Sequence, residues 1–293
     1  MTQPLVSVLM PVFNAAGTLP ATLRSIQWQT YPHWELILID DGSSDATLAL
    51  GRAAALVDSR IQVVDGARNA GLAFRLNEAI GLAQGDYIAR MDADDIAYPQ
   101  RLSVQVNFML HNPQCDLLGG AAVIFDDAGR LHGIWQAPLT HAEICAKPWS
   151  RFPVPHPTWL GKREWFKRFG YASDYKKSQD QDLLLRSYTH SQFACVPDIL
   201  LGYRQERRTL RKLLAGRRHF ARSIFREALR RRAFAAGMAG LAGQAAKAAT
   251  DLITVPAGWD RWLRAESATD INPGDEASWR AIWAAVSAPD GPS

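Results

Sequence analysis

The chain has 293 residues, of which 47% are hydrophobic and 21% charged, a composition typical of a soluble globular protein with one large domain and an appendage, or with two domains. Its three cysteines are far apart in the sequence, which excludes a disulfide framework and a zinc site of closely paired cysteines. The formal charge is +4, but residues 204–232 carry twelve Lys or Arg against two Glu, so this segment contributes +10 and the remainder −6.

The first ninety or so residues alternate between apolar strands and amphipathic helices. Strands are predicted at 5–10, 34–39, 61–64 and 87–91, and helices at 19–29, 47–56 and 72–83. The first two strands are almost continuously apolar, as expected of strands buried on both faces of a parallel sheet. The βαβαβαβ order therefore predicts an α/β fold with a doubly wound, mostly parallel sheet.

Chemically distinctive residues stand where these strands end. They are Pro11, Asp40 with Asp41, Arg68 with Asn69, and Asp92 with Asp94. Ligands of such sheets bind beyond the carboxyl ends of the strands, so we expect the four loops to face one crevice. A dinucleotide is disfavoured there, because the loop from Pro11 to Gly17 lacks the Gly-x-Gly-x-x-Gly pattern that brings the backbone close to a pyrophosphate.

Three carboxylates crowd into the short segment 92–95. Asp92, Asp94 and Asp95 raise one another's pKa unless a cation or a donor-rich ligand compensates their charge. Asp92 and Asp94 are two residues apart and can converge on one ion, for which a hard divalent cation with phosphate oxygens is the natural candidate. The alternative is an acidic turn that caps the helix starting near Pro99. The segment by itself favours neither interpretation.

The second half of the chain has a less regular pattern. Helices are predicted at 101–110, 162–169 and 178–186, strands at 116–125 and 199–203, and a proline- and tryptophan-rich stretch at 136–160. His156, between two prolines, either contacts phosphate or acceptor or faces solvent from a loop. Trp159 either stacks on a sugar ring or packs in the core. Arg204 either holds a pyrophosphate or is the first charge of the basic segment.

The order and spacing of several segments resemble the GT-A glycosyltransferases of family 2. The matching segments are Ser7–Asn14, Asp40–Asp45, Arg68–Leu72 with Leu76–Ile80, Asp92–Asp95 and Asp180–Leu183. Each segment alone is a weak signal, whereas the set in this order is specific. The resemblance covers residues 5–205 and implies the GT-A fold, with a catalytic domain at 1–208.

The resemblance also implies a role for each matching position. Asp180 would be the general base, Asp94 the ligand of Mn²⁺ or Mg²⁺, and Asp92 a contact of the ribose or sugar. Pro11 and Phe13 would line the nucleotide pocket. Asp41, with Asp40, would accept a hydrogen bond from the nucleotide base, and Arg68 would lie near base or phosphate. The predicted nucleotide-sugar site comprises Pro11, Phe13, Asn14, Asp40, Asp41, Arg68, Asp92, Ala93 and Asp94.

Asp182 competes with Asp180 for the role of general base. On a helix the two side chains point about 200° apart, so only one can face the crevice. We assign the base to Asp180, because Asp182 suits a first-turn acid. A single base opposite the leaving group predicts inversion at the anomeric carbon. Gln179, where members of the family often carry an acid, motivates an alternative: a catalytically silent sugar-nucleotide-binding or membrane scaffold protein with the same fold.

A helical extension is predicted at 209–293. From Leu210 its apolar residues keep helical spacing among many arginines. This amphipathic helix either lies on an anionic membrane, with its arginines at the headgroups, or docks its apolar stripe on the catalytic domain. Nucleic acid is not expected, because no recognition module is present. No apolar run reaches about 18 residues and no basic segment opens the chain, so we expect neither a membrane span nor a signal peptide.

These observations together predict an inverting, metal-dependent glycosyltransferase. It would move a hexose or related sugar from UDP, GDP or dTDP to a hydroxyl of a saccharide or lipid-linked acceptor, in surface polysaccharide or glycolipid biosynthesis. The metal would stabilise the departing diphosphate, and a carboxylate would take the proton of the acceptor hydroxyl. We expect a cytoplasmic protein that is peripheral to the inner face of the cytoplasmic membrane if the extension binds lipid.

Overall fold

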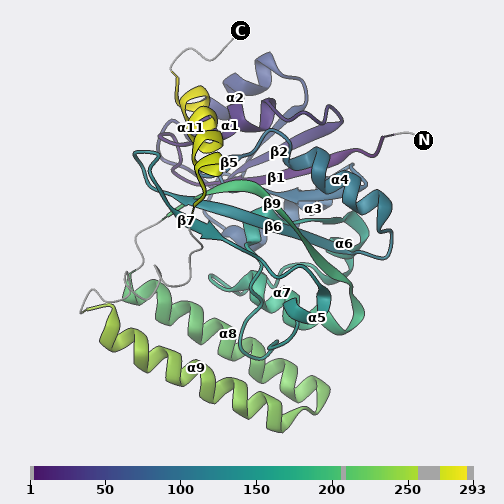
Figure 1. Cartoon of the computed structure of the whole chain (residues 1–293), viewed down its shortest axis with the longest axis vertical. Coiled ribbons are helices and arrows are strands. Elements are labelled where there is room, and N and C mark those ends of the chain that lie inside the picture. Colours follow the sequence, from purple (N-terminus) through teal and green to yellow (C-terminus); the bar gives the residue numbers. More distant parts are fainter. Residues whose placement is uncertain (1–2, 206–208, 257–270, 289–293) are drawn as a thin grey trace.

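The computed structural model describes residues 3–205, 209–256 and 271–288. Figure 1 shows a twisted central sheet between layers of helices, a two-helix hairpin at one end of the molecule, and a last helix that returns to the sheet. In the described residues the sheet has nine strands in the order β3-β2-β1-β4-β8-β6-β9-β5, with β7 paired to β6.

The N-terminal half builds the parallel part of the sheet. β1 (Val6–Val12) lies between β2 (Trp34–Asp40) and β4 (Tyr87–Arg90), and β3 (Ile61–Asp65) pairs with the other edge of β2. The connecting helices are α1 (Leu19–Gln27), α2 (Thr47–Val57) and α3 (Leu72–Leu82). The interior strands β1 and β2 are mostly apolar because both faces of the sheet are covered. The predicted βαβαβαβ order is confirmed.

The second half of the sheet is mixed rather than parallel. β8 (Leu160–Lys162) runs antiparallel to β4 and to β6 (Leu117–Phe125), whereas β9 (Phe193–Arg204) runs parallel to β6. β5 (Ile96–Ala97) pairs antiparallel with β9, and β7 (Leu131–Trp135) with β6. β6 and β9 nevertheless run in the same direction as the first four strands, so the predicted mostly parallel sheet is confirmed, with β5, β7 and β8 as the antiparallel strands of the described residues.

Short helices connect these later strands. They are α4 (Arg101–His111), α5 (His141–Ile144), α6 (Arg163–Phe169), α7 (Gln179–Ser187) and the 3₁₀ turns His156–Thr158 and Tyr188–His190. Arg101 at the start of α4 is fully buried, and its guanidinium donates to the backbone oxygens of Arg90 and Pro157. It thereby ties the end of β4 to the proline-rich stretch, which supplies a wall of the region described below.

In the described residues, three helices follow β9: α8 (Leu210–Arg231), α9 (Phe234–Thr254) and α11 (Pro273–Ser287). α8 and α9 form the hairpin, and α8 packs on α7 through the buried side chains of Phe220 and Ile224. α11 lies on the sheet, where Trp279 is 1% exposed and contacts Phe125. None of the described helices is both long and apolar enough to cross a bilayer.

Candidate active site

The acidic turn 91–95 joins the end of β4 to β5. The hydroxyls of Thr18 and Thr22 donate to the backbone oxygen of Ala93, at 2.9 and 3.0 Å. On the other side of the turn, the backbone N–H of Arg204 donates to the Asp95 carboxylate at 2.8 Å. The turn is thus fixed from α1 and from β9, and its conformation does not depend on the carboxylates alone.

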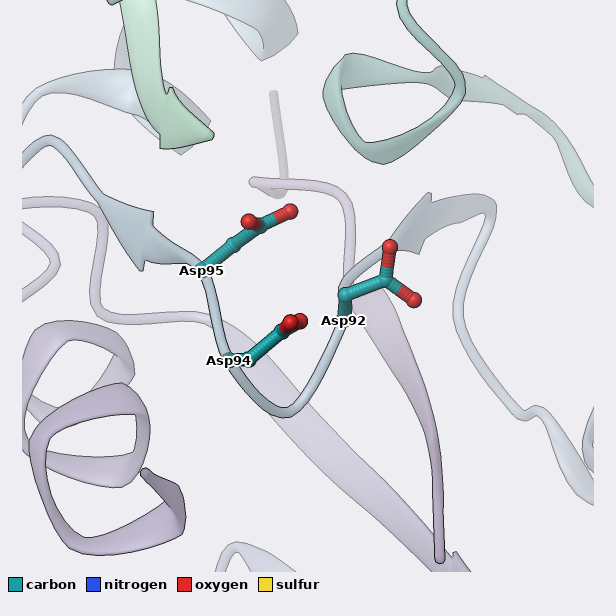
Figure 2. A group of neighbouring side chains, drawn as sticks. All are labelled: Asp92, Asp94 and Asp95. Atoms are coloured by element: carbon teal, nitrogen blue, oxygen red, sulfur yellow. The ribbon is translucent and has the colours of Figure 1, made fainter. Parts of the chain in front are cut away.

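The carboxylates of Asp92, Asp94 and Asp95 lie together on this turn, with one oxygen of each within 4.8 Å of the others. Figure 2 shows Asp94 and Asp95 projecting toward the Asp92 side of the turn. Burial, together with the charges of Asp92 and Asp94, raises the pKa of Asp95 well above its usual range. Its Oδ2 is buried and has no hydrogen-bond partner in the described part of the chain.

This donor set fits a divalent cation. Three hard oxygen ligands of like charge, one with an unsatisfied buried oxygen, are the chemistry that Mn²⁺ or Mg²⁺ would compensate. The sequence interpretation named Asp94 as the ligand and did not assign Asp95 a role. The spacing of the three acids was visible in the sequence, but the burial of Asp95 under β9 was not.

Arg90, the last residue of β4, is the buried cation of this region and was missed in the sequence. Its guanidinium forms an ion pair with Asp92, and the side chain is only about 4% exposed. Two of its nitrogens, Nε and Nη1, are buried without a partner among the described residues. A charged residue at the end of a short strand is usually exposed, so the sequence does not indicate that Arg90 is buried beneath the acidic turn.

Asp180 lies in the first turn of α7 and is half-buried. Burial raises the pKa of its carboxyl, and a hydrogen bond from the Gln181 side chain (3.3 Å) and the charge of Arg90 act in the opposite direction. Gln181 in turn bonds both backbone groups of Phe152. The carboxylate is therefore held by a glutamine that is itself anchored to the proline-rich stretch.

The pKa of the buried Tyr171 is affected both by Asp180 and by the acidic turn. The pKa of Tyr171 is raised by burial, and Asp180 and Asp92 add to this effect while Arg90 opposes it. Asp180 and Asp92 are 88 positions apart in the sequence, yet the charges of both act on the Tyr171 hydroxyl.

Asp182 has a different environment from Asp180. It is 3% exposed, and its carboxylate accepts a hydrogen bond from Arg186 at 2.7 Å. Arg186 also donates to the backbone oxygens of Phe169 and Gly170. Asp182 is thus occupied in joining α7 to the end of α6.

Two residues of the proline-rich stretch have definite positions. His156 is buried, not facing solvent, and its Nε2 lies 2.8 Å from the hydroxyl of Tyr171. Burial, with Arg90 nearby, holds the pKa of His156 well below its usual range, so the ring is neutral at pH 7. Trp159 is fully buried and packs edge-on to His156. The interpretation of His156 as a solvent-facing residue is wrong, because the 3₁₀ turn places the ring beneath the loop.

The loops after β1 and β2 lie at the same edge of the sheet as the acidic turn, because β1, β2 and β4 are parallel. Asn14 accepts a hydrogen bond from the backbone of Ser44 at 2.8 Å. Asp40 is 1% exposed and accepts from the backbone of Gly42 and Ser43. Phe13 is 49% exposed, which leaves its ring surface available, and Pro11 is partly buried.

Asp41 organises the loop that carries Arg68. Its carboxylate accepts from the backbone N–H groups of Ala70 and Gly71, at 2.7 and 2.9 Å, and from Arg75 at 2.8 Å. Arg75 also donates to the backbone oxygen of Arg68, whose side chain is exposed. The Asp41 carboxylate therefore already accepts hydrogen bonds within the protein and holds the loop that carries Arg68. The sequence motif did not indicate this structural role.

Arg204 joins β9 to the acidic turn. Its Nε donates to the backbone oxygen of Asp94 at 2.9 Å, and its Nη1 pairs with Asp127. The guanidinium also lies over the rings of Phe125 and Trp283. Arg204 belongs to the sheet and not to the helical extension.

A family model described as glycosyl transferase family 2 matches residues 7–170. The chain belongs to glycosyltransferase family 2. The resemblance predicted from the motifs is confirmed, and the match covers the parallel half of the sheet, the acidic turn and the proline-rich stretch.

Two curated relatives of this family 2 chain are bacterial proteins. EpsE of Bacillus subtilis, which carries the name putative glycosyltransferase, is 41% identical over 189 residues, which are 63% of this chain and 67% of EpsE. WfgD of Escherichia coli, named as a UDP-Glc:alpha-D-GlcNAc-diphosphoundecaprenol beta-1,3-glucosyltransferase, is 37% identical over 124 residues, which are 42% of this chain and 48% of WfgD. The alignments thus span about half to two thirds of these relatives.

A solved structure resembles the family 2 chain over almost its whole length. The mannosyltransferase PcManGT of Pyrobaculum calidifontis, in complex with GDP-Man and Mn²⁺, superimposes with a TM-score of 0.61 at 18% identity, covering 97% of this chain and 87% of PcManGT. At this level of identity the likeness concerns the fold, and it confirms the predicted GT-A architecture.

Proposed function

We propose that this chain is an inverting, metal-dependent glycosyltransferase that moves a sugar from a nucleoside diphosphate to an acceptor hydroxyl. The observation that carries the proposal is the joint environment of two acidic elements: a turn with three carboxylates and a separate half-buried acid, Asp180, around the buried cation Arg90. The acidic turn would stabilise the departing nucleoside diphosphate, and Asp180 would activate the acceptor hydroxyl.

The acidic turn is proposed to serve the leaving group. Asp92, Asp94 and Asp95 would hold Mn²⁺ or Mg²⁺, which when bound supplies positive charge to the oxygens of the diphosphate. Arg90 presents unpaired N–H groups beside the same turn and would neutralise charge on the departing group. Phe13, Asn14, Asp40, Asp41 and Arg68 are proposed to border the nucleotide.

Asp180 is proposed to take the proton of the acceptor hydroxyl. A carboxylate is an efficient general base when its pKa approaches the working pH, and burial raises the pKa of Asp180 in that direction. It acts alone across from the acidic turn, which supports a single displacement with inversion. Asp182 is unsuited to this role because Arg186 occupies its carboxylate.

Substrates are proposed by analogy with the relatives. WfgD is named for a UDP-linked donor and a lipid-diphosphate-linked acceptor, and PcManGT was solved with GDP-Man. We propose a UDP, GDP or dTDP sugar as the donor and a saccharide or lipid-linked acceptor, in surface polysaccharide or glycolipid biosynthesis. The enzyme would work at the inner face of the cytoplasmic membrane, with residues 1–208 as catalytic domain and 209–293 as extension.

The test compares nucleotide release and sugar transfer in three variants. With each nucleotide sugar and Mn²⁺, the wild type should release nucleoside diphosphate in the presence of an acceptor. Asp94→Ala and Asp180→Asn should each abolish transfer, whereas Asp182→Asn should retain it. Tight donor binding by the wild type without release of nucleoside diphosphate, across many acceptors, would instead favour the catalytically silent binding protein.

A further inference from the structure

Part of the apolar stripe predicted on the first extension helix faces the catalytic domain and part faces outward. Phe220 and Ile224 are at most 4% exposed and join the core cluster that contains Leu183 and Leu184 of α7. This part of the stripe therefore docks α8 on the catalytic domain. Two other apolar side chains of the same helix, Phe225 and Leu229, are 54% and 51% exposed, and docking does not explain them.

The outer side of α8 combines these apolar groups with arginines. At 100° per residue, Arg218, Arg222, Phe225 and Leu229 fall within about 60° of one another around the helix axis. All four are exposed. Along its whole length α8 has eight basic residues and a single acid, Glu227, which is buried. Several of the basic side chains form ion pairs, among them Arg222 with Asp174. The exposed Arg211 and Arg218 have no ion-pair partner among the described residues and leave positive charge on the outward side of the helix.

The outer side of α9 has no charge at all. Its exposed residues on one face include Phe234, Met238 and Leu252, with alanines between them, and Met238 is 66% exposed. The helix has two charged residues between Phe234 and Thr254, and both point inward: Lys247 donates to Ser150 and Asp251 pairs with Arg217 of α8. An uncharged face three turns or more in length is unusual for a helix that meets only water.

We propose that this hairpin face docks on an anionic lipid bilayer. The hairpin face is defined as Phe225 and Leu229 of α8 and Phe234, Met238 and Leu252 of α9, flanked by Arg211 and Arg218. Figure 1 shows the two helices side by side at the end of the molecule, with α9 outermost. Apolar side chains enter the headgroup boundary, and the long arginine side chains reach anionic headgroups beside them.

Charge complementarity selects this occupant. A second copy of the chain would bring the same arginines together across a symmetric interface, where like charges repel. An anionic bilayer pairs with the arginines and also covers the uncharged face of α9. The inference extends the proposed function, which places the acceptor at a membrane, but vesicle binding requires neither donor nor acceptor and is measured independently of turnover.

The experiment is co-sedimentation of the full chain with vesicles. One set contains phosphatidylglycerol and phosphatidylcholine, and the other only phosphatidylcholine, both at low salt. We expect binding to the anionic vesicles that weakens with salt. The double variant Phe225→Ser/Met238→Ser and the variant Arg218→Glu should each weaken partitioning about tenfold. The matched control is Leu56→Ser/Val57→Ser, which removes two side chains on α2 that are 89% and 82% exposed, and it should bind as the wild type does.

Three outcomes would overturn the proposal. They are absence of wild-type binding to anionic vesicles, equal binding by the hairpin variants and the control, and a dimer in light scattering that Phe225→Ser/Met238→Ser dissolves without any vesicle binding. Asp94→Ala separates the two proposals: it should lose transfer and keep vesicle binding. The hairpin variants and their control alter exposed positions, and circular dichroism verifies that every variant, Asp94→Ala included, is folded.

Discussion

The guanidinium of Arg204 donates a hydrogen bond to the backbone oxygen of Asp94 over 2.9 Å, across 110 positions of sequence. The same residue donates from its backbone to the carboxylate of Asp95. Trp283 of α11 and Phe125 of β6 flank the guanidinium. The geometry of the acidic turn thus depends on a strand end and on a helix that both lie outside the matched family region.

Loss of this support should weaken metal binding. Arg204→Ala removes the bond to Asp94, and residues that orient metal ligands typically contribute 10–100-fold to affinity. We expect at least a tenfold rise in the Kd for Mn²⁺, measured by calorimetry without substrates. Arg130→Ala is the control, because Arg130 is exposed and its ion pair, within the part of the chain that the structure describes, is with Asp126 on the neighbouring turn. Unchanged Mn²⁺ affinity in Arg204→Ala would contradict the supporting role.

Asp95→Asn should have opposite effects on metal binding and on stability. The buried Asp95 carboxylate lies beside Asp92 and Asp94, and burial with their charges raises its pKa. Without metal its charged form destabilises the fold, so the amide should leave the melting temperature of the metal-free protein equal or higher. Mn²⁺ affinity should fall at least tenfold. Calorimetry and thermal unfolding with EDTA check the two halves, and a lower metal-free melting temperature would be inconsistent with this account.

The rate of transfer should depend on the ionisation of Asp180. The carboxyl must be deprotonated to act as a base, and its pKa is raised by burial, so kcat/KM should fall as the pH drops through that raised pKa. Arg90 and Tyr171 face the same group, but Tyr171 has a raised pKa and an arginine does not titrate in this range. Asp180→Asn should lower kcat by 10²–10⁴-fold or more, and the pH–rate profile is the measurement.

Gln181 offers a finer test of the same group. Its side-chain N–H donates to the Asp180 carboxylate at 3.3 Å and stabilises the ionised form. Gln181→Ala removes that donor, so the pKa of Asp180 should rise and the acidic limb of the pH–rate profile should move to higher pH. In Asp182→Asn the limb should stay in place even if the protein becomes less stable. If the pH–rate profiles of the wild type and Gln181→Ala coincide, the hydrogen bond from Gln181 does not set the pKa of Asp180.

The helix that carries Asp180 is held at both ends by α8. The backbone N–H of Lys177 donates to Nδ1 of His219 at 3.0 Å, and Ser178 donates to the oxygen of Gly216 at 3.0 Å. At the other end, Arg231 donates to the oxygen of Leu185 at 3.0 Å. His219→Ala should therefore lower kcat several-fold and leave Mn²⁺ affinity unchanged. The exposed His111→Ala is the control, and equal kcat in both variants would count against this coupling.

The parallel half of the fold was predictable because β1 and β2 are long and mostly apolar and because helices of regular spacing separate the strands. A run such as Leu36–Ile39 is buried on both faces and has no other explanation. β5, with two residues, and β8, with three, carry no periodic signal. Their place in the sheet is decided by pairing with β9 and β4, which a local pattern does not contain.

The residues of the candidate site were predictable where they form a charged sequence motif. They were not predictable where their role depends on being buried. The three acids of 92–95 were evident, whereas the buried positions of Arg90 and His156 were not, since both look like surface residues in sequence. The amphipathic pattern of α8 had the same ambiguity: it identified Phe220 and Ile224 as one face but not the surface that the face covers. Only contacts with α7 resolve it.

The matched family region ends at residue 170, ten positions before Asp180 and forty before α8 begins. A fragment cut at that border would keep the proposed metal ligands and lose Asp180, the proposed proton acceptor, together with the helix α8 that holds it. Excised or transplanted versions of this protein should therefore extend at least through Arg231. Because α8 bonds both ends of α7, binding at the outer side of the hairpin should also affect the orientation of Asp180.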